Sequence, residues 1–233
     1  IGNIHGNVLE AGWEGPYMIT EWGPDGSFQA HKVNDFAPIE QPSHDKANLY
    51  YQRYQDYIVS ETVRDRVLGS FVFKLADVRA HTHTWYNLLL EDSKKTPWMD
   101  EMIRAWTGEY PDNLAPRVRS LSLTSTRYDH KVLDHLVDDE VIVSPGEKLH
   151  FKVDAFDPDG DPIEYRWEMR YDYDEVSARI PPLVLEAAPQ PDPEDPAVQY
   201  FHAPMQAGNY RVYVYVYDGH HNVGTHNFPF RVQ

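Results

Sequence analysis

The sequence predicts an α/β part followed by an all-β part. Residues 1–109 carry strand and helix signals in alternation, the order typical of a parallel sheet with helices packed on it. Residues 118–233 carry short strands separated by Pro, Gly and Asp turns and no clear long helix, which favours an immunoglobulin-like β-sandwich. Between them, residues 110–117 contain Pro, Asp and Asn and indicate a linker.

In the first part, hydrophobic spacing locates each element. The two strongest strand candidates are apolar and rich in β-prone residues, so we expect both to be buried on both faces. Ser43 offers an N-cap for the first long helix, and Thr96 with Pro97 opens the second. The expected elements are a strand end at residues 1–4, a helical turn at 7–10 that ends at Gly12, strands at 17–22 and 69–73, and helices at 43–66 and 97–107.

In the second part, turn residues separate the strands. Alternation places Tyr213, Tyr215 and Tyr217 on one face of a strand and three valines on the other. This tyrosine stripe either stacks on sugars or a partner surface, or is covered by neighbouring strands or an adjacent domain. The expected strands are residues 141–143, 149–155, 163–169, 210–217 and 226–232.

Composition limits the function classes. The formal net charge of −16 disfavours nucleic acid or an anionic membrane as a partner, and no apolar run is long enough for a membrane span. The chain has no cysteine, which excludes disulfides and thiolate metal sites. It begins at Ile1 without a signal-peptide pattern, so we expect a processed chain or a piece of a longer one.

The most informative stretch is Thr20-Glu21-Trp22-Gly23-Pro24, at the end of the strand at residues 17–22. A carboxylate at the carboxyl end of such a strand is costly to bury without a role, and catalytic groups of (β/α)8 barrels lie there. With Gly12–Thr20, Gly69–Phe73 and Thr84-Trp85-Tyr86, this stretch resembles the end of a barrel in the clan A, family 2-like group of retaining glycoside hydrolases.

The resemblance implies a partial (β/α)8 barrel in residues 1–109, comprising strands six to eight. Strands one to five would come from a missing N-terminal segment or from another chain. In that group a Glu ending the seventh strand is the nucleophile, which corresponds to Glu21. Trp22, Trp85 and Tyr86 are the candidates for contact with a sugar. The alternative is a purely structural role, in which these aromatic residues cover the end of the barrel core.

Two features depart from that group. Its acid/base residue normally lies in an Asn-Glu pair, and no such pair occurs in this sequence. Relatives carry a Trp under the sugar two residues after the Val-Phe of the last strand, where this chain has Leu75. Glu21 therefore represents half of a retaining pair, and the second carboxyl is expected outside this chain.

The second part resembles a PKD or cadherin-like module, through residues 155–167 and 208–219. Such modules are commonly appended to secreted bacterial carbohydrate-active enzymes, which implies an extracellular location.

Two groups of residues are candidates for metal ligands. Asp157, Asp159 and Asp161 alternate around Gly160, a spacing that suits calcium, although the same residues also suit a simple turn between strands. His81 and His83 would share one face of an extended segment, but no third zinc ligand is evident nearby.

Two functions from different classes remain open. The first is a secreted glycoside hydrolase-like protein, which requires no cofactor and acts on carbohydrate once its barrel is complete. The alternative is a non-catalytic carbohydrate-binding or structural adhesion protein with a decayed barrel.

Overall fold

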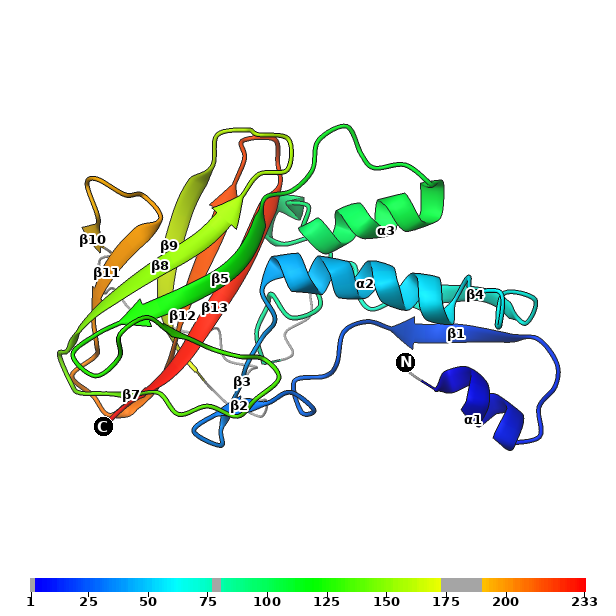
Figure 1. Cartoon of the computed structure of the whole chain (residues 1–233), viewed down its shortest axis with the longest axis horizontal. Helices are drawn as coiled ribbons and strands as arrows, with labels where there is room; N and C mark the ends of the chain where they lie inside the picture. Colours follow the sequence, from blue (N-terminus) through cyan, green and yellow to red (C-terminus); the bar gives the residue numbers. More distant parts are fainter. Residues whose placement is uncertain (1–2, 77–80, 173–189) are drawn as a thin grey trace.

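The computed structural model describes residues 3–76, 81–172 and 190–233 and shows a mixed α/β chain with more strand than helix. Figure 1 shows the long helices at one end of the molecule and the larger sheets at the other. No helix among the described residues is long and apolar enough to cross a membrane. The elements are α1 (Ile4–Glu10), β1 (Tyr17–Trp22), β2 (Lys32–Val33), β3 (Ala37–Pro38), α2 (Ser43–Tyr57), β4 (Val67–Val72), the 3-10 turn η1 (Glu91–Ser93), α3 (Pro97–Thr107), β5 (Arg117–Thr124), β6 (Lys131–Val132), β7 (Ile142–Val143), β8 (Lys148–Phe156), β9 (Glu164–Tyr171), β10 (Gln190–Pro191), β11 (Val198–His202), β12 (Gly208–Tyr217) and β13 (Val223–Val232).

The expected combination of α/β and β elements is confirmed, and several bounds differ. Ile4 belongs to helix α1 and not to a strand. Helix α2 ends at Tyr57, about two and a half turns earlier than the apolar spacing indicated. Ser43 is its first helical residue and does not cap it; the Ser43 hydroxyl oxygen accepts a hydrogen bond from the Val118 N–H at 2.9 Å instead. Helix α3 ends as expected before Gly108, whose φ of 87° suits glycine.

β1 and β4 form a two-stranded parallel sheet that is covered on one face. Helices α2 and α3 pack on that face, where Ile19 and Trp22 of β1 share a core with Tyr50 and Trp98. Figure 1 shows the two helices lying along the two strands. One apolar layer on one face gives this sheet half of the cover that parallel sheets normally have.

The opposite face of the same sheet is open among the described residues. Met18 and Phe71 belong to this face by register and are 51% and 59% exposed, and Leu68 at its edge is 70% exposed. The expectation that both strands are buried on both faces is therefore wrong. Their hydrophobicity matches a two-sided environment, but the described residues supply neither a second layer nor further strands at the sheet edges.

The second part consists of two sheets that share one core. The strand orders are β10-β11-β8-β5-β6 and β7-β13-β12-β9. The core between them is formed by the inward side chains of both sheets, including Leu121 and Phe151 from one and Val214 and Phe228 from the other. The five strands expected here are present with shifted ends, and strands β5, β6, β10 and β11 were not expected. The immunoglobulin-like assignment of these sheets stays a prediction.

The two parts are joined by more than the linker. Val33, Ala37 and Ile39, which precede α2, are buried in the core of the two-sheet part. The hydrogen-bonded pair β2–β3 thus lies beneath the sheets, although its residues fall within 1–109. The domain boundary at residues 110–117 stays a prediction, and the packing of these three side chains crosses it.

Candidate functional site

Glu21 lies at the carboxyl end of β1, at a pocket of about 470 Å³. Between the pairs Ile19–Ser70 and Trp22–Val72, β1 has two residues where β4 has only Phe71. This β-bulge leaves both Thr20 and Glu21 exposed and returns Trp22 to the helix-covered core. The Glu21 carboxylate accepts no hydrogen bond from any residue that the structure describes, so its oxygens are available to a ligand.

The turn after β1 is fixed by three contacts. Arg53 of α2 donates one N–H to Gly23 O at 2.6 Å and another to Asp25 Oδ1 at 2.8 Å. At position 23, a Cβ would lie 2.7 Å from Phe73 O, so the close approach of the two strand ends requires glycine. The indole N–H of Trp85 donates to Asp25 O at 2.9 Å. The rim of the pocket is therefore held by helix α2 and by the segment after β4.

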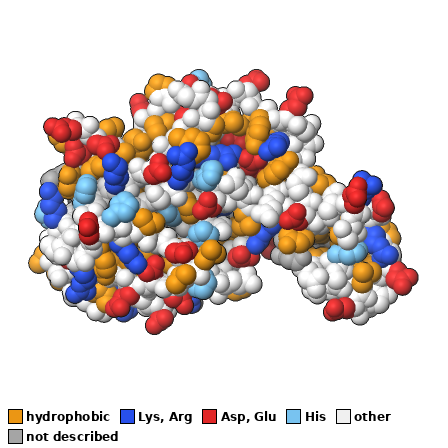
Figure 2. Space-filling view, in the orientation of Figure 1, with side chains coloured by type: hydrophobic (Ala, Val, Ile, Leu, Met, Phe, Trp, Pro, Cys, Tyr) orange, Lys and Arg blue, Asp and Glu red, His pale blue; other side chains and the backbone are white. Residues whose placement is uncertain are grey.

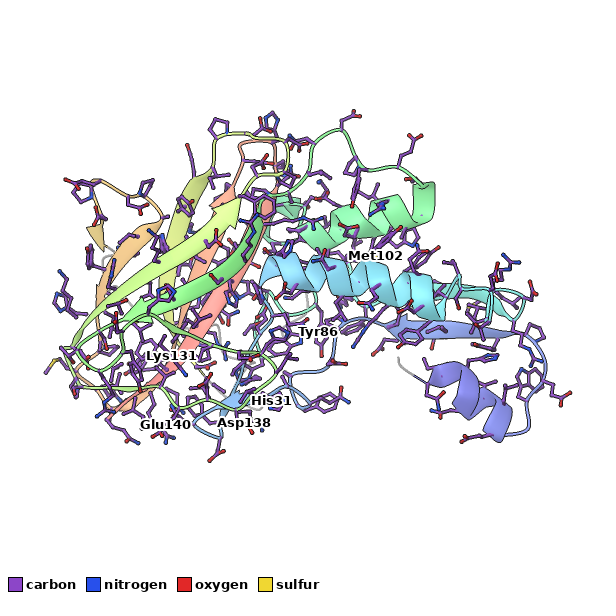
Figure 3. The ribbon with its side chains drawn as sticks, in the orientation of Figure 1. His31, Tyr86, Met102, Lys131, Asp138 and Glu140 are labelled. Carbon is purple, nitrogen blue, oxygen red and sulfur yellow. The ribbon has the colours of Figure 1, made fainter. Side chains whose placement is uncertain are left out.

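The three aromatic candidates occupy different positions. Tyr86 and Trp22 line the pocket, but Trp22 is 4% exposed and packs against Tyr50, so it offers little surface to a sugar. Trp85 is also 4% exposed and lies outside the lining, where it anchors the Asp25 backbone. Figure 3 shows Tyr86 between the end of β1 and the loops below the sheets. Of the three, the geometry favours Tyr86 as a ligand contact.

The lining joins amides, carboxylates and aromatic rings, a combination that suits the hydroxyl groups and apolar faces of a neutral polar ligand. Arg53, Asp25, Asn3, Asn7, Gln29, Phe28 and Phe73 lie in it besides Glu21 and Tyr86. Sequence reasoning missed this set because its members come from separate segments. Among the described residues of the lining, the carboxylate besides Glu21 is that of Asp25, which is ion-paired with Arg53.

The part of the chain before β1 projects from the body of the molecule. None of the side chains of α1 is buried, and Leu9 and Trp13 are 41% and 54% exposed. Figure 2 shows a protruding lobe at this end of the molecule, and it carries both acidic and basic side chains. Asn3 and Asn7 reach the pocket from this lobe, so one wall of the pocket rests on a helix with little packing of its own.

Asp157, Asp159 and Asp161 lie in the turn between β8 and β9, with one carboxylate oxygen from each within 4.8 Å of the others. Asp157 Oδ1 accepts hydrogen bonds from the N–H groups of Asp159 and Asp161, which is the expected Asp-Gly turn. Asp159 accepts from Leu114 N–H at 2.6 Å and Asp161 from Asn113 Nδ2 at 2.7 Å. The group thus holds the linker to the two-sheet part, and calcium binding stays a prediction.

The histidines and the tyrosine stripe meet at the contact between the two parts. His83 Nε2 lies 2.8 Å from Tyr215 OH, and its ring lies 5.2 Å from that of Tyr213. His81 instead lies 2.9 Å from Asp172 and has a positive φ of 64°, so the segment is not extended there. Tyr213 and Tyr215 are 5% and 6% exposed, which supports a covered face over a free sugar platform.

No family model matches this sequence, and no curated protein sequence matches it. Among solved structures, the chain is similar to a nucleoside hydrolase-related hypothetical protein from Saccharophagus degradans that is associated with carbohydrate metabolism. The TM-score is 0.34 at 15% identity, over 58% of this chain and 30% of that chain. It is also similar to PcoC, a methionine-rich copper resistance protein from Escherichia coli, with a TM-score of 0.27 at 18% identity, over 40% of this chain and 87% of that chain. At these TM-scores neither likeness carries an argument about fold or function.

Proposed function

We propose that this chain is part of a secreted glycoside hydrolase-like protein in which Glu21 is the retaining nucleophile. Its carboxylate would attack the anomeric carbon, forming a glycosyl–enzyme ester as the bond to the leaving oxygen breaks. A carboxylic acid from outside this chain would protonate that oxygen. Water would then hydrolyse the ester, with the same outside group acting as base.

One observation carries the proposal. Glu21 is exposed, free of hydrogen bonds from the described residues, and directed by a bulge into a pocket at the carboxyl ends of two parallel strands. In (β/α)8 barrels, catalytic groups lie at this end of the strands. The cover of α2 and α3 on the other face of β1 and β4 agrees with helices packed outside a barrel wall.

The open side of this sheet supports completion of the barrel by further strands. Met18 and Phe71 are exposed on the face that would be the inner face of a barrel wall. The backbone edges of β1 and β4 that face away from each other have no partner strand within the described residues. Strand six at the edge of β1 and strand one at the edge of β4 would pair in parallel, and the closed barrel would cover both side chains. Because Ile4, at the expected end of strand six, belongs to helix α1, strand six would have to be supplied together with strands one to five. They would come from a preceding segment of the same protein or from another chain.

The nucleophile assignment is testable in this chain without an acid/base residue. Aryl 2-deoxy-2-fluoroglycosides with a dinitrophenolate leaving group need no protonation, so a positioned carboxylate is sufficient for attack. We expect slow loss of dinitrophenolate and a covalent adduct on Glu21, located by peptide mass spectrometry. A panel of gluco-, galacto- and manno-configured reagents covers the common sugars.

Two variants complete this experiment. Glu21→Gln keeps the size of the side chain and removes the nucleophile, so the adduct is expected to disappear. Asp25→Asn keeps Glu21 and tests the other carboxylate in the lining. An adduct on Asp25, or equal release of dinitrophenolate by Glu21→Gln and the unchanged chain, would rule out the assignment.

A non-catalytic carbohydrate-binding protein is the second candidate. The observation that favours it is the lining itself, in which the sole carboxylate besides Glu21 from the described part of the chain is the ion-paired Asp25. The exposed Leu75, at the position where relatives carry a Trp, points the same way. This candidate predicts that Glu21→Gln leaves the Kd for an oligosaccharide unchanged and that Tyr86→Ala weakens it, both by calorimetry.

For the second part, we propose a PKD or immunoglobulin-like module that is carried next to the hydrolase-like part. The two sheets with a shared core and the Asp-rich turn support this assignment. Calcium at Asp157, Asp159 and Asp161 is part of the same proposal, as is a location outside a bacterial cell.

A further inference from the structure

The segment 82–86 passes between the two parts, with its two threonines bonded to Glu40 and Trp85 and Tyr86 at the pocket. Thr82 and Thr84 are 2% and 0% exposed and donate their hydroxyl hydrogens to Glu40 Oε2 at 2.6 and 2.9 Å. Trp85 donates its indole N–H to Asp25 O, and Tyr86 lines the pocket. The position of this segment therefore determines how two elements of the pocket rim are held.

Glu40 is the point at which the segment is held. Its Oε1 accepts from Lys46 Nζ at 2.5 Å, and its Oε2 accepts from Asn227 Nδ2 at 2.6 Å as well as from the two threonines. Burial raises the pKa of Glu40, but the Lys46 charge and the hydrogen bonds outweigh burial and lower this pKa to about 2. At neutral pH the group is a carboxylate, which acts only as an acceptor.

Asn227 connects this carboxylate to the two-sheet part. It lies on β13, is 2% exposed, and accepts from Arg211 Nη1 at 2.5 Å. Arg211 on β12 is fully buried and donates to Asp172 Oδ2 at 2.9 Å, just after β9. Three neighbouring strands of one sheet thus fix the orientation of the Asn227 amide.

We propose that Asn227 and Glu40 are positioning residues through which the two-sheet part sets the rim of the pocket. The side chains of this connected series are all at least nine-tenths buried: Arg211, Asn227, Glu40, Thr82, Thr84 and Trp85. Hydrogen bonds in such surroundings are strong and hold one geometry. The second part then acts on the pocket without touching a ligand. This inference goes beyond the proposed function, because it concerns how the rim is held whatever the pocket binds.

Hydrogen exchange with mass spectrometry tests the coupling on the whole chain. Asn227→Ala removes the amide between Arg211 and Glu40, and we expect roughly tenfold faster exchange in residues 82–88 and 23–29. The matched control is Asn222→Ala. Asn222 is 3% exposed and bonds to Asn113 and Asp218, so its loss also loosens a contact between the second part and the preceding chain. In the control, faster exchange is expected around residue 113 and not in residues 23–29.

A second variant acts at the pocket end of the chain of bonds. Trp85→Phe keeps an aromatic ring in the core and removes the donor to Asp25 O, so exchange should rise in residues 23–29 while β12 and β13 remain protected. The proposal is overturned if Asn227→Ala changes only β13 and its sheet neighbours, or if it speeds exchange evenly along the chain. The proposal is also overturned if Trp85→Phe leaves exchange in residues 23–29 unchanged. If Asn227→Ala does not fold, the result with Trp85→Phe alone tests the proposal.

Discussion

Replacement of Glu40 by Gln is expected to destabilise the protein strongly, because it leaves the Lys46 ammonium buried without a counter-charge. Both side chains of the pair are 2% exposed. The pKa of Glu40, lowered from 4.5 to about 2, corresponds to about 3 kcal/mol in favour of the ionised form, at 1.36 kcal/mol per pH unit. Removal of one partner of a buried pair typically costs about 3–5 kcal/mol, which agrees with this value.

The assay is urea unfolding at pH 7, followed by tryptophan fluorescence. With a slope of about 2–3 kcal/mol per molar, the loss corresponds to a midpoint lower by about 1–2 M. The double variant Glu40→Leu, Lys46→Met should be more stable than Glu40→Gln, since it leaves no buried charge.

Asp154→Asn is the matched control for this measurement. Its ion pair with Arg119 is about half exposed on both sides, so its loss is expected to change the free energy of unfolding by less than about 1 kcal/mol. If Glu40→Gln unfolds at the same urea concentration as Asp154→Asn, the buried pair does not stabilise the fold as argued.

Three further predictions follow from burial and charge. Burial lowers the pKa of His226 to about 3 in the folded protein, whereas an unfolded histidine has a pKa near 6.5. The unfolded state therefore binds the proton first as the pH decreases. The free energy of unfolding should fall between about pH 6.5 and about pH 3. His226→Gln should flatten this dependence by up to about 1.4 kcal/mol per pH unit, and an equally steep dependence in the variant would contradict the assignment. Phe71→Ser, on the exposed face of the β1–β4 sheet, should cost less than about 0.5 kcal/mol, whereas Ile19→Ala on the helix-covered face should cost about 2–4 kcal/mol. Equal losses would refute one-sided burial of this sheet. Adding calcium to chelator-treated protein should raise Tm, and Asp157→Asn should abolish the rise. If Tm does not rise at millimolar calcium, the proposed calcium site is wrong.

Local pattern located much of the fold. The strand at Tyr17–Trp22 and the helix at Pro97–Thr107 have the bounds that the sequence indicated, because periodicity and end signals lie within a few residues of each other. Strand β5 was missed because Arg117, Arg119 and Ser120 interrupt its alternation; the later Leu121-Ser122-Leu123 was the available signal. The early end of α2 was also missed, because Ile58 continues the apolar spacing.

The candidate site was predictable only at its centre. Glu21 lies at the end of a strong strand signal, so its position at a strand end could be predicted from the sequence. The fixed turn around Asp25 was not, since Arg53 and Trp85 are 28 and 60 residues away along the chain. Trp22 and Trp85 were expected as sugar contacts from residue type and from their positions after the two strands, and their burial follows from packing that neither specifies.

The sequence by itself determined the α/β and β composition, the position of most of the longer strands and helices, and the place of a carboxylate at the end of β1. These properties depend on residues that are close along the chain. Only the tertiary structure decided that the described residues cover one face of β1 and β4 and not the other, and that Glu40 bonds to Asn227 across 187 residues of chain. Contacts of that separation depend on how whole elements pack, and the chemistry of the two residues alone does not reveal them.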